Sequence, residues 1–162
     1  MTRLVPVAPE HGPAVQRLVE GSPDVVRQTR LPDPYPPDGA ASWIAGVAPR
    51  HARGEEYAFA VVDGACDVAG VCGLVVDGDE AELGYWIGRP YRGRGHATAA
   101  AWAALRVAWE AGLRRVFALP LAENAPSRRV LERAGLRLVG ERPAEARWPG
   151  RRQAVYEALR PR

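Results

Sequence analysis

The sequence predicts a mixed α/β (α+β) domain, in which an antiparallel meander is followed by a strand–helix–strand unit. Three segments, 56–63, 68–77 and 80–88, contain the aromatic and β-branched residues typical of strands, and only short turns separate them. The next long segment, 97–112, is rich in alanine and has apolar residues at helical spacing, and a strand-like segment follows it. No linker-like stretch interrupts the chain, so we expect residues 1–162 to form a single domain.

The N-terminal third predicts one strand and two helices around a long loop. Residues 3–8 are expected to form the first strand, and residues 9–21 a helix that ends at a glycine. Residues 22–40 contain five prolines and cannot form one regular element, so we expect a long irregular loop, which in a compact domain is often functional. A second short helix is expected over residues 41–54.

The C-terminal half predicts alternating helices and strands. The helix 97–112 has Trp102, Leu105 and Trp109 at helical spacing, and we expect both tryptophans to lie in the core. The remaining expected elements are a strand at 115–121, a helix at 125–135 that ends at Gly135, and strands at 136–141 and 153–160 with a polar connector between them.

The net charge of +3 is unevenly distributed along the chain. Residues 1–80 carry six arginines and twelve acids, whereas residues 81–162 carry sixteen arginines and seven acids. A basic C-terminal half suggests an anionic ligand there. The chain has no lysine, however, so many of its arginines must simply be solvated surface charges. No basic helix is interleaved with aromatic residues, and we expect no nucleic-acid partner.

Composition also bounds the compartment and the cofactors. No apolar run approaches 18 residues and the N-terminus lacks an apolar signal core, so we expect a cytoplasmic protein without membrane contact. Cys66 and Cys72 fit small, reduced, buried thiols. His11, His51 and His96 are scattered and match no zinc-ligand spacing, so we expect no metal.

The segment YRGRGHATAA (91–100) has the chemistry of a phosphate cradle. It lies between a strand and a helix, where unpaired backbone N–H groups and the helix dipole attract an anion. Gly93 and Gly95 lack a Cβ and let the backbone approach a phosphate closely. Arg92 and Arg94 add positive charge and bidentate hydrogen-bonding capacity.

Three kinds of phosphate cradle compete for this loop. A P-loop needs Gly-Lys-Ser/Thr, which the sequence lacks. A dinucleotide fingerprint needs a third glycine where this chain has Thr98, and it usually follows the first strand of a βαβ unit. The third kind is the acyl-CoA pyrophosphate loop, Arg/Gln-x-x-Gly-x-Gly/Ala. Arg92, Gly95 and Ala97 match each of its specified positions.

With this loop and the segments that follow, the sequence resembles the GNAT superfamily of acyl-CoA-dependent N-acyltransferases, specifically its RimJ/RimL-like branch. The strongest parts are ELGYWIGRPYRGRGHATAA (82–100) and NAPSRRVLERAGLRLVGE (124–141), and PYPPDGAASWIA (34–45) looks like the branch's acceptor-side loop. The resemblance implies a GNAT-like fold, acetyl-CoA as donor, and direct transfer of an acetyl group to a primary amine. That amine is a protein N-terminal α-amine or a small amine. Similar proteins are commonly homodimers.

The resemblance implies a donor site and two catalytic groups. The donor site comprises Arg92, Gly93, Arg94, Gly95, His96, Ala97, Thr98, Asn124 and Arg128, with Arg128 or Arg129 reaching the 3′-phosphate. His96 itself is expected to pack or to be solvated. Ser127 is expected to protonate the leaving thiolate, because Leu131 stands where many members have a tyrosine. This departure keeps a second reading open, a non-catalytic CoA-binding sensor or interaction module on the same fold.

The acceptor side offers candidates rather than a motif. Glu82 opens the strand that leads into the cradle and is the first candidate for the base that deprotonates the amine, with Glu145 in the polar connector as the second. Tyr85 and Trp86 alternate along the strand, so one should face the core and the other the cleft. Tyr35, in the proline-rich loop, is expected either to line the acceptor pocket or to pack.

Overall fold

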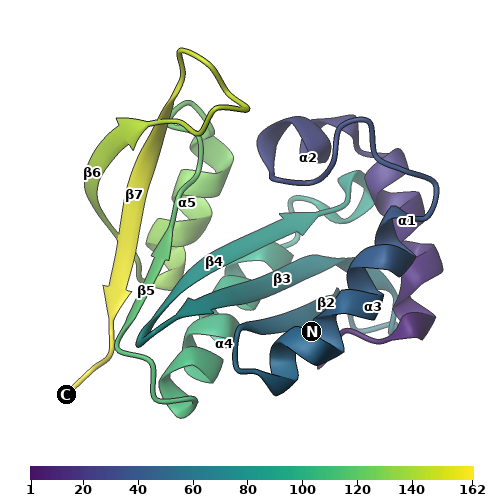
Figure 1. Ribbon diagram of the computed structural model, residues 1–162, viewed down its shortest axis with the longest axis horizontal. Helices are drawn as coiled ribbons and strands as arrows, with labels where there is room; N and C mark the ends of the chain where they lie inside the picture. Colours follow the sequence, from purple (N-terminus) through teal and green to yellow (C-terminus); the bar gives the residue numbers. More distant parts are fainter.

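A seven-stranded mixed sheet organises the chain in the computed structural model, which describes residues 1–162 (Figure 1). Its strand order is β1-β2-β3-β4-β5-β7-β6, and every pairing is antiparallel except β4–β5. The strands are β1 (Arg3–Pro6), β2 (Glu56–Val62), β3 (Val68–Asp77), β4 (Glu80–Ile87), β5 (Arg115–Ala118), β6 (Arg137–Pro143) and β7 (Arg152–Leu159). The predicted meander β2–β3–β4 is confirmed.

Helices cover both faces of the sheet (Figure 1). They are α1 (Gly12–Glu20), α2 (Pro23–Gln28), α3 (Gly39–Ala52), α4 (His96–Glu110) and α5 (Ala125–Ala134), with 3₁₀ turns η1 (Pro9–His11) and η2 (Arg89–Tyr91). Helix α4 packs on one face of the meander and against α5, whereas α1 and α3 pack on the opposite face. None of these helices has the length and apolar character needed to span a membrane.

Helix α2 corrects the expectation of a fully irregular loop over residues 22–40. Pro23 stands in the first turn, where its missing N–H has no partner to lose, so it starts a helix rather than breaking one. Val25 and Val26 are buried and hold this short helix against its neighbours. The irregular stretch is therefore limited to the residues between α2 and α3.

The main core lies between the meander and helices α4 and α5. Ala100, Ala101, Ala104 and Ala108 are fully buried on α4, and their small side chains let the helix lie close to the sheet. The expectation that Trp102 lies in the core is wrong, because its side chain is 54% exposed.

Two other side chains bear on the expected core. Trp109 packs only partly buried against the core, because the alanines take the sheet-facing side of α4. Both cysteines are free, but only Cys72 is buried, since Cys66 lies exposed in the β2–β3 turn.

The sheet opens between β4 and β5, and this opening positions the site. Residues Glu80–Glu82 of β4 pair with Arg115–Phe117 of β5, and the two strands do not pair beyond these residues. Beyond Glu82 they diverge, which Figure 1 shows as a V between β4 and β5. Alternate backbone groups of β4 that would face β5 have no strand partner beyond this point.

Candidate active site

A cleft of about 1110 Å³ occupies the V between β4 and β5. Its donor-side wall comes from the loop before α4, the first turn of α4 and the first turns of α5. Its opposite wall comes from α2, the α2–α3 segment and the start of α3, with Trp148 and Gln153 at the end near β7. Residues from both halves of the chain therefore meet in one cavity.

The loop before α4 has the backbone geometry of an anion cradle. Gly93 and Gly95 adopt φ values of +75° and +82°, a region that L side chains rarely take, and no heavy atom lies within 4 Å of the place where a Cβ would stand. Gly95 is the N-cap of α4, and the first internal helical bond runs from the N–H of Ala99 to the carbonyl of Gly95. The N–H groups at His96, Ala97 and Thr98 precede that bond and line the cleft wall.

The imidazole of His96 does not take part in this cradle. It is buried, its Nδ1 lies 2.9 Å from Thr2 Oγ1, and its ring meets Tyr91 edge-on. The packing role expected for this side chain agrees with its burial. Its contribution to the cleft comes from its backbone at the start of α4.

Arg92, Arg94 and Arg128, which are predicted to contact the donor, all contact other protein groups. The first two lie beside the cradle. Arg92 lines the cleft, but its guanidinium donates to the carbonyl of Ile87 (2.9 Å) and pairs with Asp24 (2.8 Å). Partial burial raises the pKa of Asp24, but hydrogen bonding and charge from Arg92 and Arg89 outweigh it, and the net pKa is lowered. Arg94 lies over the ring of Tyr91 and does not line the cleft.

Helix α5 presents a different arginine from the one predicted. The guanidinium of Arg128 donates to the hydroxyl of Tyr156 and to the carbonyl of Ala122, both at 3.0 Å, and lies outside the cleft lining. Arg133, one and a half turns later, lines the cleft and has no ion-pair partner. Arg133 lies seven positions after Pro126, on the same face of α5, but nothing in the sequence favours it over Arg128 or Arg129.

Ser127 and Tyr85 form a hydroxyl pair in the cleft. Asn124 caps α5 by accepting a hydrogen bond from the N–H of Ser127 (3.2 Å), as its position predicted. The phenol of Tyr85, reaching across from β4, lies 2.8 Å from Ser127 Oγ and 3.1 Å from the Ser127 carbonyl oxygen. Burial raises the pKa of Tyr85 far above its usual value, so the phenol stays protonated. Tyr85 packs against the main core, and Trp86 packs against a second apolar cluster formed by Val15, Val19, Val26, Ala40 and Val71. Both residues line the cleft, so the expectation that only one of them would face it is wrong.

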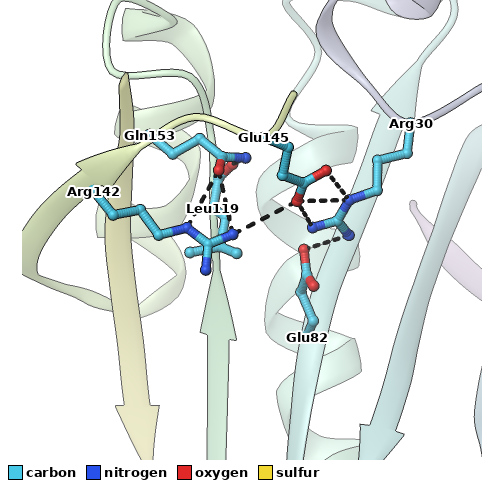
Figure 2. A network of polar contacts seen from close by, with 6 residues as sticks. All are labelled: Arg30, Glu82, Leu119, Arg142, Glu145 and Gln153. Carbon is cyan, nitrogen blue, oxygen red and sulfur yellow. Dashed lines mark hydrogen bonds and ion pairs between the residues drawn. The ribbon is translucent and has the colours of Figure 1, made fainter. Parts of the chain in front are cut away.

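At the acceptor end, the two candidate bases meet on one cation (Figure 2). Arg30, between α2 and α3, pairs with Glu82 of β4 through Nη1 at 2.7 Å. Its Nε lies 3.0 Å from each oxygen of Glu145, and its Nη2 also donates to Glu145. Hydrogen bonding to Arg30 lowers the pKa of Glu145. No sequence signal indicated Arg30, which stands 52 positions from one partner and 115 from the other.

The contacts continue from Glu145 to the end of β5. Arg142 of β6 lies 3.6 Å from Glu145 and 3.3 Å from the Oε1 of Gln153, a buried residue of β7. Gln153 in turn donates to the carbonyl of Leu119, just beyond β5 (3.1 Å). Figure 2 shows this polar network bridging the mouth of the V from β4 to β5.

A second cavity of about 180 Å³ adjoins the cleft on the face of the sheet that α1 and α3 cover. Its floor includes Gly73 and Gly84, which are direct cross-strand neighbours. Tyr35, Trp43 and Trp86 line it as well, so the packing and lining roles considered for Tyr35 coexist. We call this cavity the acceptor groove. It shares Glu82 and Arg30 with the cleft.

The sequence and the fold were compared with those of known proteins. The family model described as the acetyltransferase (GNAT) domain matches residues 2–137. The chain belongs to the GNAT acetyltransferase family. A comparison with curated proteins found no matching relative. Like the rest of its family, this acetyltransferase takes the acetyl group from acetyl-CoA.

Solved structures share the fold of this acetyltransferase at low sequence identity. RimL, a ribosomal L7/L12 alpha-N-protein acetyltransferase in complex with coenzyme A, is 20% identical with a TM-score of 0.88, over 98% of this chain and 94% of that one. RimJ of Mycobacterium smegmatis, in complex with CoA-disulfide, is 22% identical with a TM-score of 0.86, over 98% and 81%.

The fold does not by itself indicate an acceptor. The microcin C7 self-immunity acetyltransferase MccE, in complex with acetyl-CoA and AMP, is 18% identical with a TM-score of 0.86, over 98% and 92%. Proteins as differently described as RimL and MccE thus share this architecture. The acceptor of the present acetyltransferase therefore depends on its own residues around the cleft.

Proposed function

We propose that this acetyltransferase transfers the acetyl group of acetyl-CoA directly to the α-amine at the N-terminus of a peptide or protein. One observation carries the proposal. The V between β4 and β5 brings Glu82, Ser127 and the anion cradle of α4 into one cavity, and an open groove leads away from Glu82 over Gly84. RimL, a ribosomal L7/L12 alpha-N-protein acetyltransferase, and the ribosomal-protein-S5-alanine acetyltransferase from Vibrio fischeri share this fold, which supports a protein acceptor.

The donor would lie along the V with its pyrophosphate at the start of α4. The open space above Gly93 and Gly95, which a Cβ would fill, fits a phosphate group held by backbone N–H groups. Arg133 would add a cation for a phosphate on the α5 side. Acetyl-CoA supplies a thioester, whose carbonyl the unpaired N–H groups of β4 beyond Glu82 would polarise.

Glu82 and Ser127 take the two proton-transfer roles in this proposal. Glu82, at the groove, would accept a proton from the amine, which attacks only in its neutral form. Ser127 would give a proton to the leaving thiolate and be reprotonated through Tyr85, whose hydroxyl lies 2.8 Å away. Holding amine and thioester together would supply a large share of the rate, up to about 7–11 kcal/mol.

Two measurements, of acetyl-CoA binding and of turnover, test the proposed function. Acetyl-CoA binding by calorimetry, followed by thiol release with a panel of peptide and small amines, separates an enzyme from a sensor. Turnover with peptides whose free amine is at the N-terminus supports the proposal, and turnover confined to small amines contradicts it. Binding of acetyl-CoA without turnover of any peptide would also contradict the proposal.

The base is tested by paired isosteric variants. Glu82→Gln should lower kcat/KM by about 10²-fold or more, because the amide cannot accept the proton. Glu145→Gln should lower it much less and leave the acid limb of the pH profile in place. The reverse ranking would transfer the role of base to Glu145.

A further inference from the structure

Arg30 lies between the two candidate bases and bridges their carboxylates, which belong to different elements. Glu82 comes from β4, and Glu145 comes from the connector between β6 and β7. We propose that the Arg30 guanidinium occupies the place of the acceptor's ammonium group, and that a cationic acceptor amine binds by displacing it. This inference rests on the proposed function and specifies how its acceptor site discriminates.

Arg30 is free to move because other contacts hold the surrounding segments together. Arg147 donates to the carbonyls of Val26 (3.3 Å) and Leu31 (2.9 Å). The buried Trp148 donates through Nε1 to the carbonyl of Arg27 (2.7 Å). These bonds join the β6–β7 connector to α2 without using the Arg30 side chain. That side chain is 48% exposed, so it can leave its two partners without unfolding either segment.

The charges around the pair explain why a cation is needed there. Arg30 is the one ion-pair partner of Glu82, whereas Glu145 also faces Arg142 and the charge of Arg147. Two neighbouring carboxylates without a cation between them repel each other, and one of them then holds a proton more tightly. A protonated primary amine brings one positive charge and three N–H donors, which suit the same two carboxylates.

Once the acceptor ammonium has displaced Arg30, it lies beside Glu82 and can lose its protons in the order that acetyl transfer requires. The ammonium gives one proton to Glu82, and the neutral amine forms the C–N bond as the C–S bond of the thioester breaks. The second proton lost by the nitrogen is matched by the proton that the thiolate takes up. Glu82 returns its proton to solvent after the product leaves, and Arg30 can then return to its place.

The test compares Arg30→Met with Arg53→Met. Arg53 is a matched control, since it pairs with Glu55 in an exposed turn at the end of α3, outside both cavities. The acceptor is trialanine amide, which carries one ammonium group, and its N-acetylated form serves as the uncharged probe. Arg30→Lys keeps a cation and should behave much like the wild type.

Arg30→Met is expected to lower the KM for trialanine amide about threefold to tenfold, because the competing internal cation is gone. It should also move the acid limb of the kcat/KM profile to higher pH, because the two carboxylates lose their shared cation. Affinity for acetyl-CoA should stay unchanged. A raised KM together with an unmoved acid limb would overturn the proposal and make Arg30 a structural or acceptor-binding group.

Calorimetry of the two peptides separates this inference from the proposed function. Tighter binding of trialanine amide, but not of its N-acetylated form, to Arg30→Met would support the ammonium site even if no variant acetylated any peptide. Acetylation of the peptide by the wild type, with equal or weaker binding to Arg30→Met, would keep the function and reject the ammonium site.

Discussion

At the scale of single residues, a hydroxyl pair crosses the V, and the proposed proton transfer to the thiolate depends on it. Ser127 lies in the first turn of α5, where the cap from Asn124 fixes its backbone. Tyr85 reaches Ser127 from β4, and its phenol contacts both the hydroxyl and the carbonyl of the serine. Leu131, one turn later, is fully buried in the core, and its aliphatic side chain offers no substitute proton donor.

Ser127→Ala is expected to lower kcat about 10- to 100-fold, because the leaving thiolate loses its proton donor. The dissociation constant for acetyl-CoA should change much less, since the change removes a group that acts in the transition state. Tyr85→Phe should have a smaller effect in the same direction, as Ser127 remains. Steady-state kinetics and calorimetry on both variants check this, and wild-type turnover in Ser127→Ala would remove Ser127 from the mechanism.

Gly95→Val should abolish measurable binding of acetyl-CoA. A valine would strain a backbone at φ +82° and fill the space in which the pyrophosphate is expected. Gly112→Val is the matched control, because Gly112 has φ +86°, equally open surroundings and a place outside the cleft. The control should bind acetyl-CoA normally in calorimetry. Affinity of Gly95→Val within about twofold of the wild type would mean that the phosphate lies elsewhere.

The role of a residue could be predicted where backbone geometry determines it. It could be predicted less well where a side chain has several possible partners. Gly95 and Asn124 follow from helix-end chemistry, and the structure places both at helix N-caps. Arg94 and Arg128 find aromatic partners that a linear motif cannot indicate. Arg30 could not be predicted, because its partners come from two distant segments.

At the scale of elements, β4 presents different residues to the two faces of the sheet. Its residues Glu82, Gly84 and Trp86 line the acceptor groove, whereas Leu83 and Tyr85 belong to the core on the α4 side. Gly84 is exposed, has no positive φ, and has no heavy atom within 4 Å of the point that a Cβ would occupy. The fold does not require a glycine there, so we expect the open space to serve the acceptor.

Gly84→Val should therefore raise the KM for a peptide acceptor about tenfold or more, because the valine would fill the groove floor beside Glu82. Acetyl-CoA affinity and thermal stability should stay close to the wild type. Gly140→Val, on the exposed edge strand β6, tests for general effects of a new valine in an open strand position. An unchanged acceptor KM in Gly84→Val would place the acceptor path elsewhere.

The order and type of most elements could be predicted, because their periodicity and glycine stops are local signals. The meander, both C-terminal helices and all seven strands lie where the pattern placed them, with shifts of a few residues at their ends. Helix α2 was not predicted, because five prolines in one segment concealed a six-residue helix with proline in its first turn. The divergence of β4 from β5 was not predictable, since it is a property of how two strands far apart in the sequence pair with each other.

At the scale of the whole molecule, the cleft lies where the acidic and basic halves of the chain meet. The donor-side wall, from the α4 loop to α5, belongs to the half with sixteen arginines and seven acids. The α2–α3 wall belongs to the half with six arginines and twelve acids. The positive balance of the C-terminal half suits an anionic donor along its wall, whereas the acceptor carboxylates Glu82 and Glu145 come from that same half.

The central claim is acetyl transfer to an N-terminal α-amine, and mass spectrometry of a peptide product tests it most directly. A peptide with a free N-terminus and one internal lysine, incubated with the protein and acetyl-CoA, should gain a single acetyl group that fragmentation places on the N-terminal residue. The Glu82→Gln variant should form much less of it. Acetylation of the lysine alone, or no acetylation of any peptide by a protein that binds acetyl-CoA, would contradict the account.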